Sequence, residues 1–134
     1  MNRPAGQLIS KRVVIGYPEQ RLAYLSEQIA ARHAQYCAIL EPGTAMLIGL
    51  VTFSDLAASA TTVNRIFADL MRKPPRHQVF RNDPATKVRS IYEVERHFEE
   101  VTVLNEDGTF YGLITLESFC TWVIQRSGKK ERVE

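Results

Sequence analysis

The sequence contains only two cysteines among its 134 residues, Cys37 and Cys120, which stand far apart in separate apolar stretches. This scarcity argues against a disulfide scaffold or a cysteine metal site, and we expect both thiols to be reduced and buried in the core. The sequence also lacks any run of about 18 apolar residues, the length that a membrane-spanning helix needs. Met1–Pro4 opens no hydrophobic signal segment, so we expect a soluble, cytoplasmic chain.

An excess of charge of one sign is also missing, because 17 Lys and Arg stand against 15 Asp and Glu, for a net charge of +2. This net charge is too small to predict a surface that follows nucleic-acid phosphates. The basic stretch Arg65–Arg81 contains no aromatic platform apart from Phe67 and Phe80, so a nucleic-acid partner is not favoured. Fractions of 45% hydrophobic and 24% charged residues predict an ordinary globular core.

The most informative feature of the sequence is an internal repeat. Gly49–Leu56 reads GLVTFSDL, and Gly112–Phe119 reads GLITLESF 63 positions later (112 minus 49). Upstream, Tyr17-Pro18 and Asp83-Pro84 each follow an apolar pair and precede a helical pattern. We infer two copies of one structural unit.

Each copy predicts the same order of elements: a β-branched strand, a proline and a helix, a second strand, a hairpin with a third strand, and a short helix. The hairpin turns are expected at Glu41-Pro42-Gly43 and at Asp107-Gly108, because these residues tolerate the backbone of tight turns. The fold class is therefore mixed α/β (α+β), with two strand–helix–hairpin–helix repeats. The expected strands and helices with defined bounds are strands 13–15, 36–40, 78–80 and 101–104, and helices 54–59, 61–71 and 117–125.

The motif residues resemble those of a tandem pair of CBS domains (a Bateman module), the regulatory repeats named after cystathionine beta-synthase. The family motif is glycine, two apolar residues, Thr or Ser, two variable residues and Asp, and Gly49–Asp55 fits it at every defined position. Asp69–Met71, followed by Pro74, resembles the Asp-x-Met stretch that opens a second repeat. The division that follows is repeat 1 at 8–60, a connector at 61–75, repeat 2 at 76–126 and a polar tail at 127–134.

The resemblance implies two repeats packed with pseudo-twofold symmetry and a homodimer of such pairs. It also implies clefts for adenosine-containing regulatory ligands, namely AMP, ADP, ATP or S-adenosylmethionine, in a protein that senses a ligand and carries no catalytic cofactor. An attached effector domain or a separate effector protein is the partner that such a module would regulate. The alternative is a ligand-free dimerisation or protein-interaction domain.

The resemblance assigns Asp55 as a ribose clamp, with Thr52 and Ser54 as hydroxyl partners. An ionised carboxylate can accept both ribose hydroxyls in charge-assisted hydrogen bonds, and a helix start favours nearby anions. By the family's pseudo-symmetry, the purine would lie against the backbone around His77, with Phe98 and Glu99 as neighbours. The competing interpretations are that Asp55 only caps the following helix and that His77 is a surface histidine.

The second motif departs from the family pattern, because Ser118 occupies the Asp position. A serine is neutral and shorter, so Thr115 and Ser118 would form a weaker second cleft. The phosphate side departs too, because Gln35-Tyr36 and Glu99-Glu100 stand where family members often place His or Arg. Four basic residues could compensate for them: Arg72, Lys73, Arg76 and Arg81.

No catalytic or metal-binding constellation emerges from the sequence. Nothing places a nucleophile, a base and an orienting group together. His33 and His97 stand near helix ends, where a cation suits the helix dipole, and no metal site is expected. On the last helix, Phe119, Trp122 and Ile124 are candidates for an exposed dimer surface.

Overall fold

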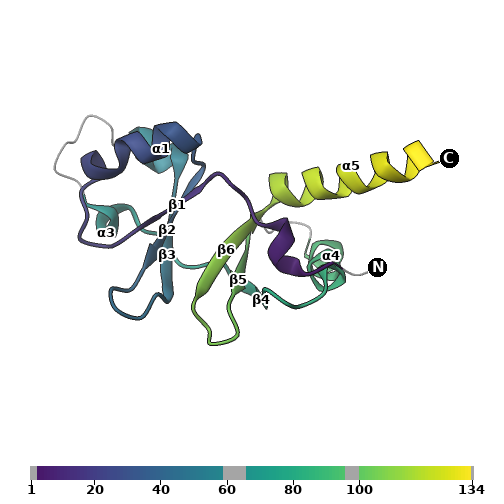
Figure 1. The fold of residues 1–134 in the computed structure, drawn as a ribbon. Helices are drawn as coiled ribbons and strands as arrows, with labels where there is room; N and C mark the ends of the chain where they lie inside the picture. Colours follow the sequence, from purple (N-terminus) through teal and green to yellow (C-terminus); the bar gives the residue numbers. More distant parts are fainter. Residues whose placement is uncertain (1–2, 59–65, 96–99, 134) are drawn as a thin grey trace. The chain divides into compact units, whose positions relative to one another are not determined.

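The computed structural model describes residues 3–58, 66–95 and 100–133, with some side chains in these ranges left undescribed (Figure 1). The chain divides into two compact units, each built on a three-stranded sheet. The β1–β3 unit comprises residues 11–75 and 108–110, and the β4–β6 unit comprises residues 1–10, 76–107 and 111–134, as far as they are described.

The β1–β3 unit has strand order β1-β2-β3, with β1 parallel and β3 antiparallel to the central strand. Its core lies between this sheet and the helices, and the fully buried side chains include Cys37, Ile39, Val51 and Phe67. Its elements are β1 (Val13–Gly16), the 3₁₀ helix η2 (Leu22–Leu25), α1 (Ser26–Arg32), β2 (Tyr36–Leu40), β3 (Leu47–Thr52), α2 (Phe53–Ala58) and α3 (Phe67–Leu70).

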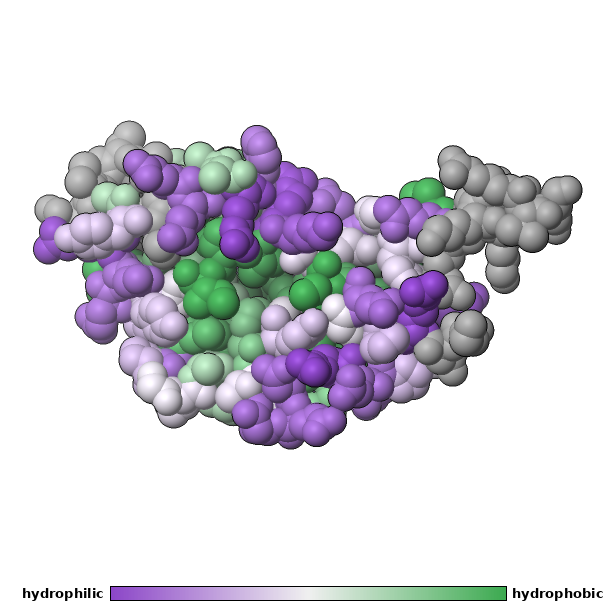
Figure 2. Space-filling view, in the orientation of Figure 1, coloured by the Kyte–Doolittle hydropathy of each residue, from purple (hydrophilic) through white to green (hydrophobic). Residues whose placement is uncertain are grey.

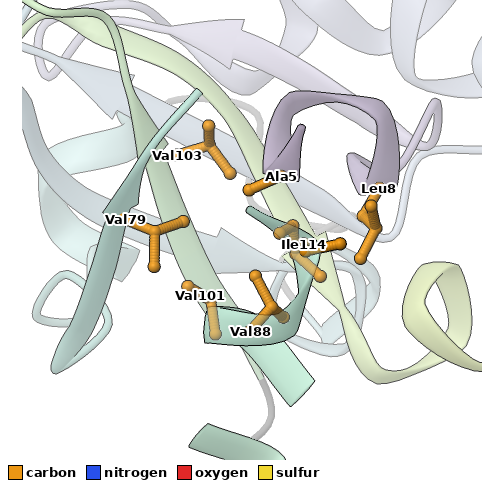
Figure 3. Close-up of a cluster of buried hydrophobic side chains, with 8 residues drawn as sticks. Ala5, Leu8, Val79, Val88, Val101, Val103 and Ile114 are labelled. Carbon is orange, nitrogen blue, oxygen red and sulfur yellow. The ribbon is translucent and has the colours of Figure 1, made fainter. Parts of the chain in front are cut away.

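The β4–β6 unit repeats this plan with strand order β4-β5-β6 and with β4 parallel to β5. Figure 3 shows its core, in which valines of the strands meet side chains of the N-terminal 3₁₀ helix and of α4. Its elements are the 3₁₀ helix η1 (Ala5–Leu8), β4 (His77–Phe80), α4 (Ala85–Val94), β5 (Glu100–Leu104), β6 (Phe110–Thr115) and α5 (Leu116–Val133).

The core of each unit is completed by a segment that precedes the other unit's first strand. Ala5 and Leu8, upstream of β1, are 0% and 1% exposed in the β4–β6 core. Phe67, upstream of β4, is 0% exposed in the β1–β3 core. The backbone follows the same pattern, because the N–H of Ser10 donates to the carbonyl of Leu113 at 2.8 Å. Neither sequence repeat therefore contains its whole core.

Because the glycine of each motif copy has no side chain, one of these segments can pack closely against the strand at that position. A Cβ at Gly49 would clash with Met71 Cγ and would lie 2.6 Å from the carbonyl oxygen of Arg72. A Cβ at Gly112 would lie 2.8 Å from Ile9 Cγ2. Since real Cβ atoms do not approach other atoms so closely, a side chain at Gly49 would displace the backbone at Arg72, and one at Gly112 would displace the side chain of Ile9.

The local sequence signals for strands and turns are confirmed. Gly43 and Gly108 have φ values of +87° and +88°, the left-handed region that a hairpin turn requires of glycine. The connector helix is observed as α3 alone, since residues 59–65 lie outside the described part of the chain. The last helix was expected to end at Gln125 and instead runs to Val133. Its final turns are rich in Lys, Arg and Glu, which are good helix formers, and the single Gly128 costs only about 1 kcal/mol.

The expectation for the cysteines is half right. Cys37 is buried, and burial raises the pKa of its thiol to about 12. Cys120 is exposed on α5, contrary to the expectation, because the neighbouring Phe119 and Trp122 take the face of the helix that packs on the core. Phe119 stacks on the ring of Tyr92 with the centroids 4.3 Å apart. Phe119 and Trp122 are therefore partly buried against the core, and of the three residues expected on an exposed surface Ile124 is the exposed one.

Leu8→Ala should lower the free energy of unfolding by about 2–5 kcal/mol, because it opens a cavity in a closely packed core. Chemical denaturation followed by circular dichroism measures this change. Val94→Ala is the matched control, since Val94 is 82% exposed and its truncation should change stability by about 0.5 kcal/mol or less. Equal effects of the two substitutions would contradict the placement of the N-terminal segment in the core.

Candidate functional site

The first motif copy forms a compact polar junction between β3 and α2. Thr52 ends the strand, and Asp55 lies in the first turn of the helix. The Asp55 N–H donates to Thr52 Oγ1 at 3.3 Å, and the Thr52 hydroxyl donates to Asp55 Oδ2 at 3.0 Å. Thr52 thus supplies the acceptor that caps α2, and the carboxylate of Asp55 does not contribute it.

Arg72 reaches the same carboxylate from the connector. Its Nε donates to Asp55 Oδ2 at 2.9 Å and its Nη2 donates to Asp55 Oδ1 at 3.1 Å. The main chain of Arg72 is held against β3, because its N–H and carbonyl both pair with Leu50, at 2.7 and 3.0 Å. The guanidinium and the carboxylate form a two-pronged ion pair, which is the most directional geometry available to these groups.

These contacts keep Asp55 ionised. The hydrogen bond from the Arg72 side chain holds the pKa of the carboxyl below its usual value near 3.8, and Thr52 acts in the same direction while partial burial opposes both. The side chain of Asp55 is 25% exposed and that of Arg72 is 63% exposed. The junction therefore presents a fixed anion, covered by a cation that itself faces water.

The second motif copy forms the same junction without a charge. The Thr115 N–H donates to Ser118 Oγ at 2.9 Å, and the Ser118 N–H donates to Thr115 Oγ1 at 3.0 Å. The Ser118 hydroxyl donates back to the carbonyl of Thr115 at 3.1 Å. This junction caps α5, and Ser118 offers a neutral hydroxyl where Asp55 offers a carboxylate.

The remaining predicted site residues belong to different parts of the chain. Ser54 is exposed in the first turn of α2. His77 begins β4 in the other unit, with its Nε2 4.0 Å from Glu95 Oε1. Phe98 and Glu99 lie outside the described residues. The structure thus brings Thr52 and Asp55 into direct contact.

Two of the basic residues expected near a phosphate have local partners in the β4–β6 unit. Arg76 Nη2 lies 3.2 Å from Glu95 Oε2, and the guanidinium of Arg81 stacks over the ring of Tyr111 at 5.3 Å. Arg72, by contrast, is part of the Asp55 junction. Its pairing was missed because 17 residues separate it from Asp55, although the Asp-x-Met stretch beside it was a signal for the connector's position.

Two further properties of the described residues bear on the site's chemistry. They include no cluster of three or more His, Cys, Asp or Glu side chains suited to a metal ion. None of the helices searched in them is both long enough and apolar enough to cross a membrane.

No family model matches the sequence, and neither does any curated protein. Solved structures do match the fold. The CBS domain pair of protein MJ0100, solved with 5′-methylthioadenosine and S-adenosyl-L-methionine, has a TM-score of 0.69 at 13% identity, over 94% of this chain and 99% of its own. This chain has the fold of a tandem pair of CBS domains.

Two other solved structures agree with this assignment of a CBS fold. AcuB from Vibrio cholerae covers 100% of this chain and 99% of its own at a TM-score of 0.73 and 17% identity. The CBS domain protein PAE2072 from Pyrobaculum aerophilum, solved with AMP, covers 88% and 91% at a TM-score of 0.67 and 12% identity. The CBS fold of this chain places the Gly49–Asp55 motif at the β3–α2 junction.

Asp55→Asn should lower the free energy of unfolding at neutral pH by about 1 kcal/mol or less, because the ion pair is partly exposed. The folded-state pKa of Asp55 lies below its unfolded value near 3.8, so this stabilisation is present above about pH 4. It is lost as the pH falls through the folded-state pKa. Urea denaturation at several pH values measures the difference between the variant and the wild type.

The Arg72→Gln background supplies the control for this experiment. If the guanidinium is the main cause of the lowered pKa, Asp55→Asn should have a smaller and flatter effect in that background. An undiminished pH dependence there would contradict the assigned cause.

Proposed function

We propose that this chain is a regulatory ligand-sensing module that binds an adenosine-containing ligand, such as AMP, ADP, ATP or S-adenosylmethionine. The observation that carries the proposal is the ionised Asp55, fixed by Thr52 at the strand end where the CBS motif places a ribose clamp. A carboxylate in this state can accept hydrogen bonds from both ribose hydroxyls, and Thr52 and Ser54 supply the neighbouring hydroxyl groups. Related folds solved with AMP and with S-adenosylmethionine support this ligand class.

The rest of the proposed site comes from the second repeat. The backbone at His77, with Phe98 and Glu99, would accommodate the purine. Thr115 and Ser118 would form the weaker cleft, because their hydroxyls already bond to their own junction and carry no charge. We therefore propose one principal nucleoside site per chain.

The proposed action is regulatory and not catalytic. A ligand shifts the balance between two arrangements of a protein only by binding one of them more tightly than the other. Such a module needs recognition groups, and the β3–α2 junction supplies them without a nucleophile–base pair. The effector would be an attached domain or a separate protein.

A thermal-shift screen of AMP, ADP, ATP, S-adenosylmethionine, adenosine and GTP tests the proposal. A ligand at about 100 times its Kd adds about 2.7 kcal/mol of apparent stability, which raises the Tm by several degrees. We expect a rise with at least one adenosyl compound that is lost in Asp55→Ala. Ser118→Ala, the equivalent change in the second motif, should keep most of the rise. Flat curves for all six compounds would reject the sensor and favour the interaction domain.

We also propose that the chain forms a homodimer through an apolar stripe on α5. Leu116, Cys120, Val123 and Ile124 share one face by helical spacing, and Ile124 is 69% exposed. Figure 2 shows apolar surface on this helix just before the grey atoms of its last turns. Such a face on a helix indicates a partner surface.

Light scattering of Ile124→Glu against wild type tests the dimer. We expect wild type at twice the chain mass and the variant shifted toward monomer, because dimerisation would bury the new carboxylate. Gln125→Glu on the same helix is the control for charge alone. A monomeric wild type, or a dimer equally stable in Ile124→Glu, would exclude this stripe as the interface.

A further inference from the structure

The carboxylate proposed to hold the ribose is already engaged by a cation of the same chain. Arg72 donates one hydrogen bond to each oxygen of Asp55, and Thr52 adds another to Oδ2. A ribose held by this carboxylate would present two adjacent hydroxyl donors to the same two oxygens. The two-pronged guanidinium and the vicinal diol are therefore competitors for one edge of Asp55.

The Arg72 side chain can break its hydrogen bonds to Asp55 without disturbing the fold around it. Its main chain is fixed to Leu50 by two hydrogen bonds, which do not involve the side chain. The side chain is 63% exposed, so water screens the ion pair and receives the guanidinium when the pair opens. The contact can thus exchange while β3 and the connector remain paired.

The consequence depends on what the ligand offers to the released guanidinium. An uncharged nucleoside offers no anion, so it binds at the expense of the Arg72–Asp55 pair. A nucleotide carries a phosphate on the same sugar, and arginine pairs well with phosphate oxygens. The exchange then replaces one charge-assisted contact with another.

Building on the proposed function, we infer that Arg72 sets the ligand specificity of this site. In the ligand-free chain it occupies the ribose-binding edge of Asp55, and in the bound state it pairs with the ligand's phosphate. The site therefore discriminates against uncharged nucleosides and in favour of nucleotides.

Calorimetric titration of AMP and of adenosine into wild type, Arg72→Gln and Arg89→Gln tests this inference. In Arg72→Gln we expect adenosine to bind about threefold more tightly, because its competitor is gone. We expect the preference for AMP over adenosine to fall by about tenfold, because the phosphate loses a charged partner. Arg89→Gln removes an equal charge whose partner is Glu93 on α4, and it should leave this preference unchanged.

Arg72→Lys provides a second variant that keeps the charge and loses the two-pronged geometry. We expect it to bind adenosine more tightly than wild type while retaining most of the preference for AMP. Unfolding curves of each variant establish that it is folded. If Arg72→Gln is unfolded, the test is made with Arg72→Lys.

The outcomes separate this inference from the proposed function. If wild type binds AMP and Arg72→Gln weakens AMP and adenosine equally, Arg72 only positions Asp55 and the inference fails while the sensor stands. An unchanged AMP preference in Arg72→Gln also overturns the inference alone. If neither ligand binds wild type or either Arg72 variant, the inference fails, and the proposed function fails with it only if the thermal-shift screen is also flat for all six compounds.

Discussion

The close approach of the connector to β3 is the constraint on which the polar junction depends. Gly49 has no side chain, so Met71 and Arg72 can lie against the strand and the backbone of Arg72 can pair with Leu50. That pairing brings the Arg72 guanidinium within reach of Asp55, where it lowers the pKa of the carboxyl. A packing requirement at one glycine thus determines the electrostatics of a site six residues away.

The two motif copies separate the requirements of the fold from those of the proposed chemistry. Gly112 leaves room for Ile9 as Gly49 leaves room for Met71. In both units, therefore, a segment from outside the sheet packs on the third strand at the motif glycine. The polar residues differ, because Ser118 caps its helix as a neutral group while Asp55 carries a charge matched by Arg72. The second copy forms its junction with the glycine and a neutral cap, so the charged pair of the first copy is not a general requirement of this junction.

The features that the sequence predicted correctly are those determined by local signals. The β-branched strands, the turn at Gly43 and the turn at Gly108 follow from residues adjacent in the chain. The exposure of Cys120 was not predicted correctly. The residues around it on α5 are apolar on more than one face, and only packing against the sheet determines which face is buried. The Arg72–Asp55 pair was also missed, since it depends on how the connector folds back on β3.

The charge of the junction also bears on which ligands it can accept. An ionised carboxylate without a counter-charge would repel the phosphate of a nucleotide, and the repulsion would increase with the partial burial of the site. Pairing with Arg72 removes this net charge in the free chain while keeping Asp55 ionised and oriented. An anionic clamp suits an anionic ligand only when a cation accompanies it, and among the residues described around Asp55 the cation seen to pair with it comes from the connector.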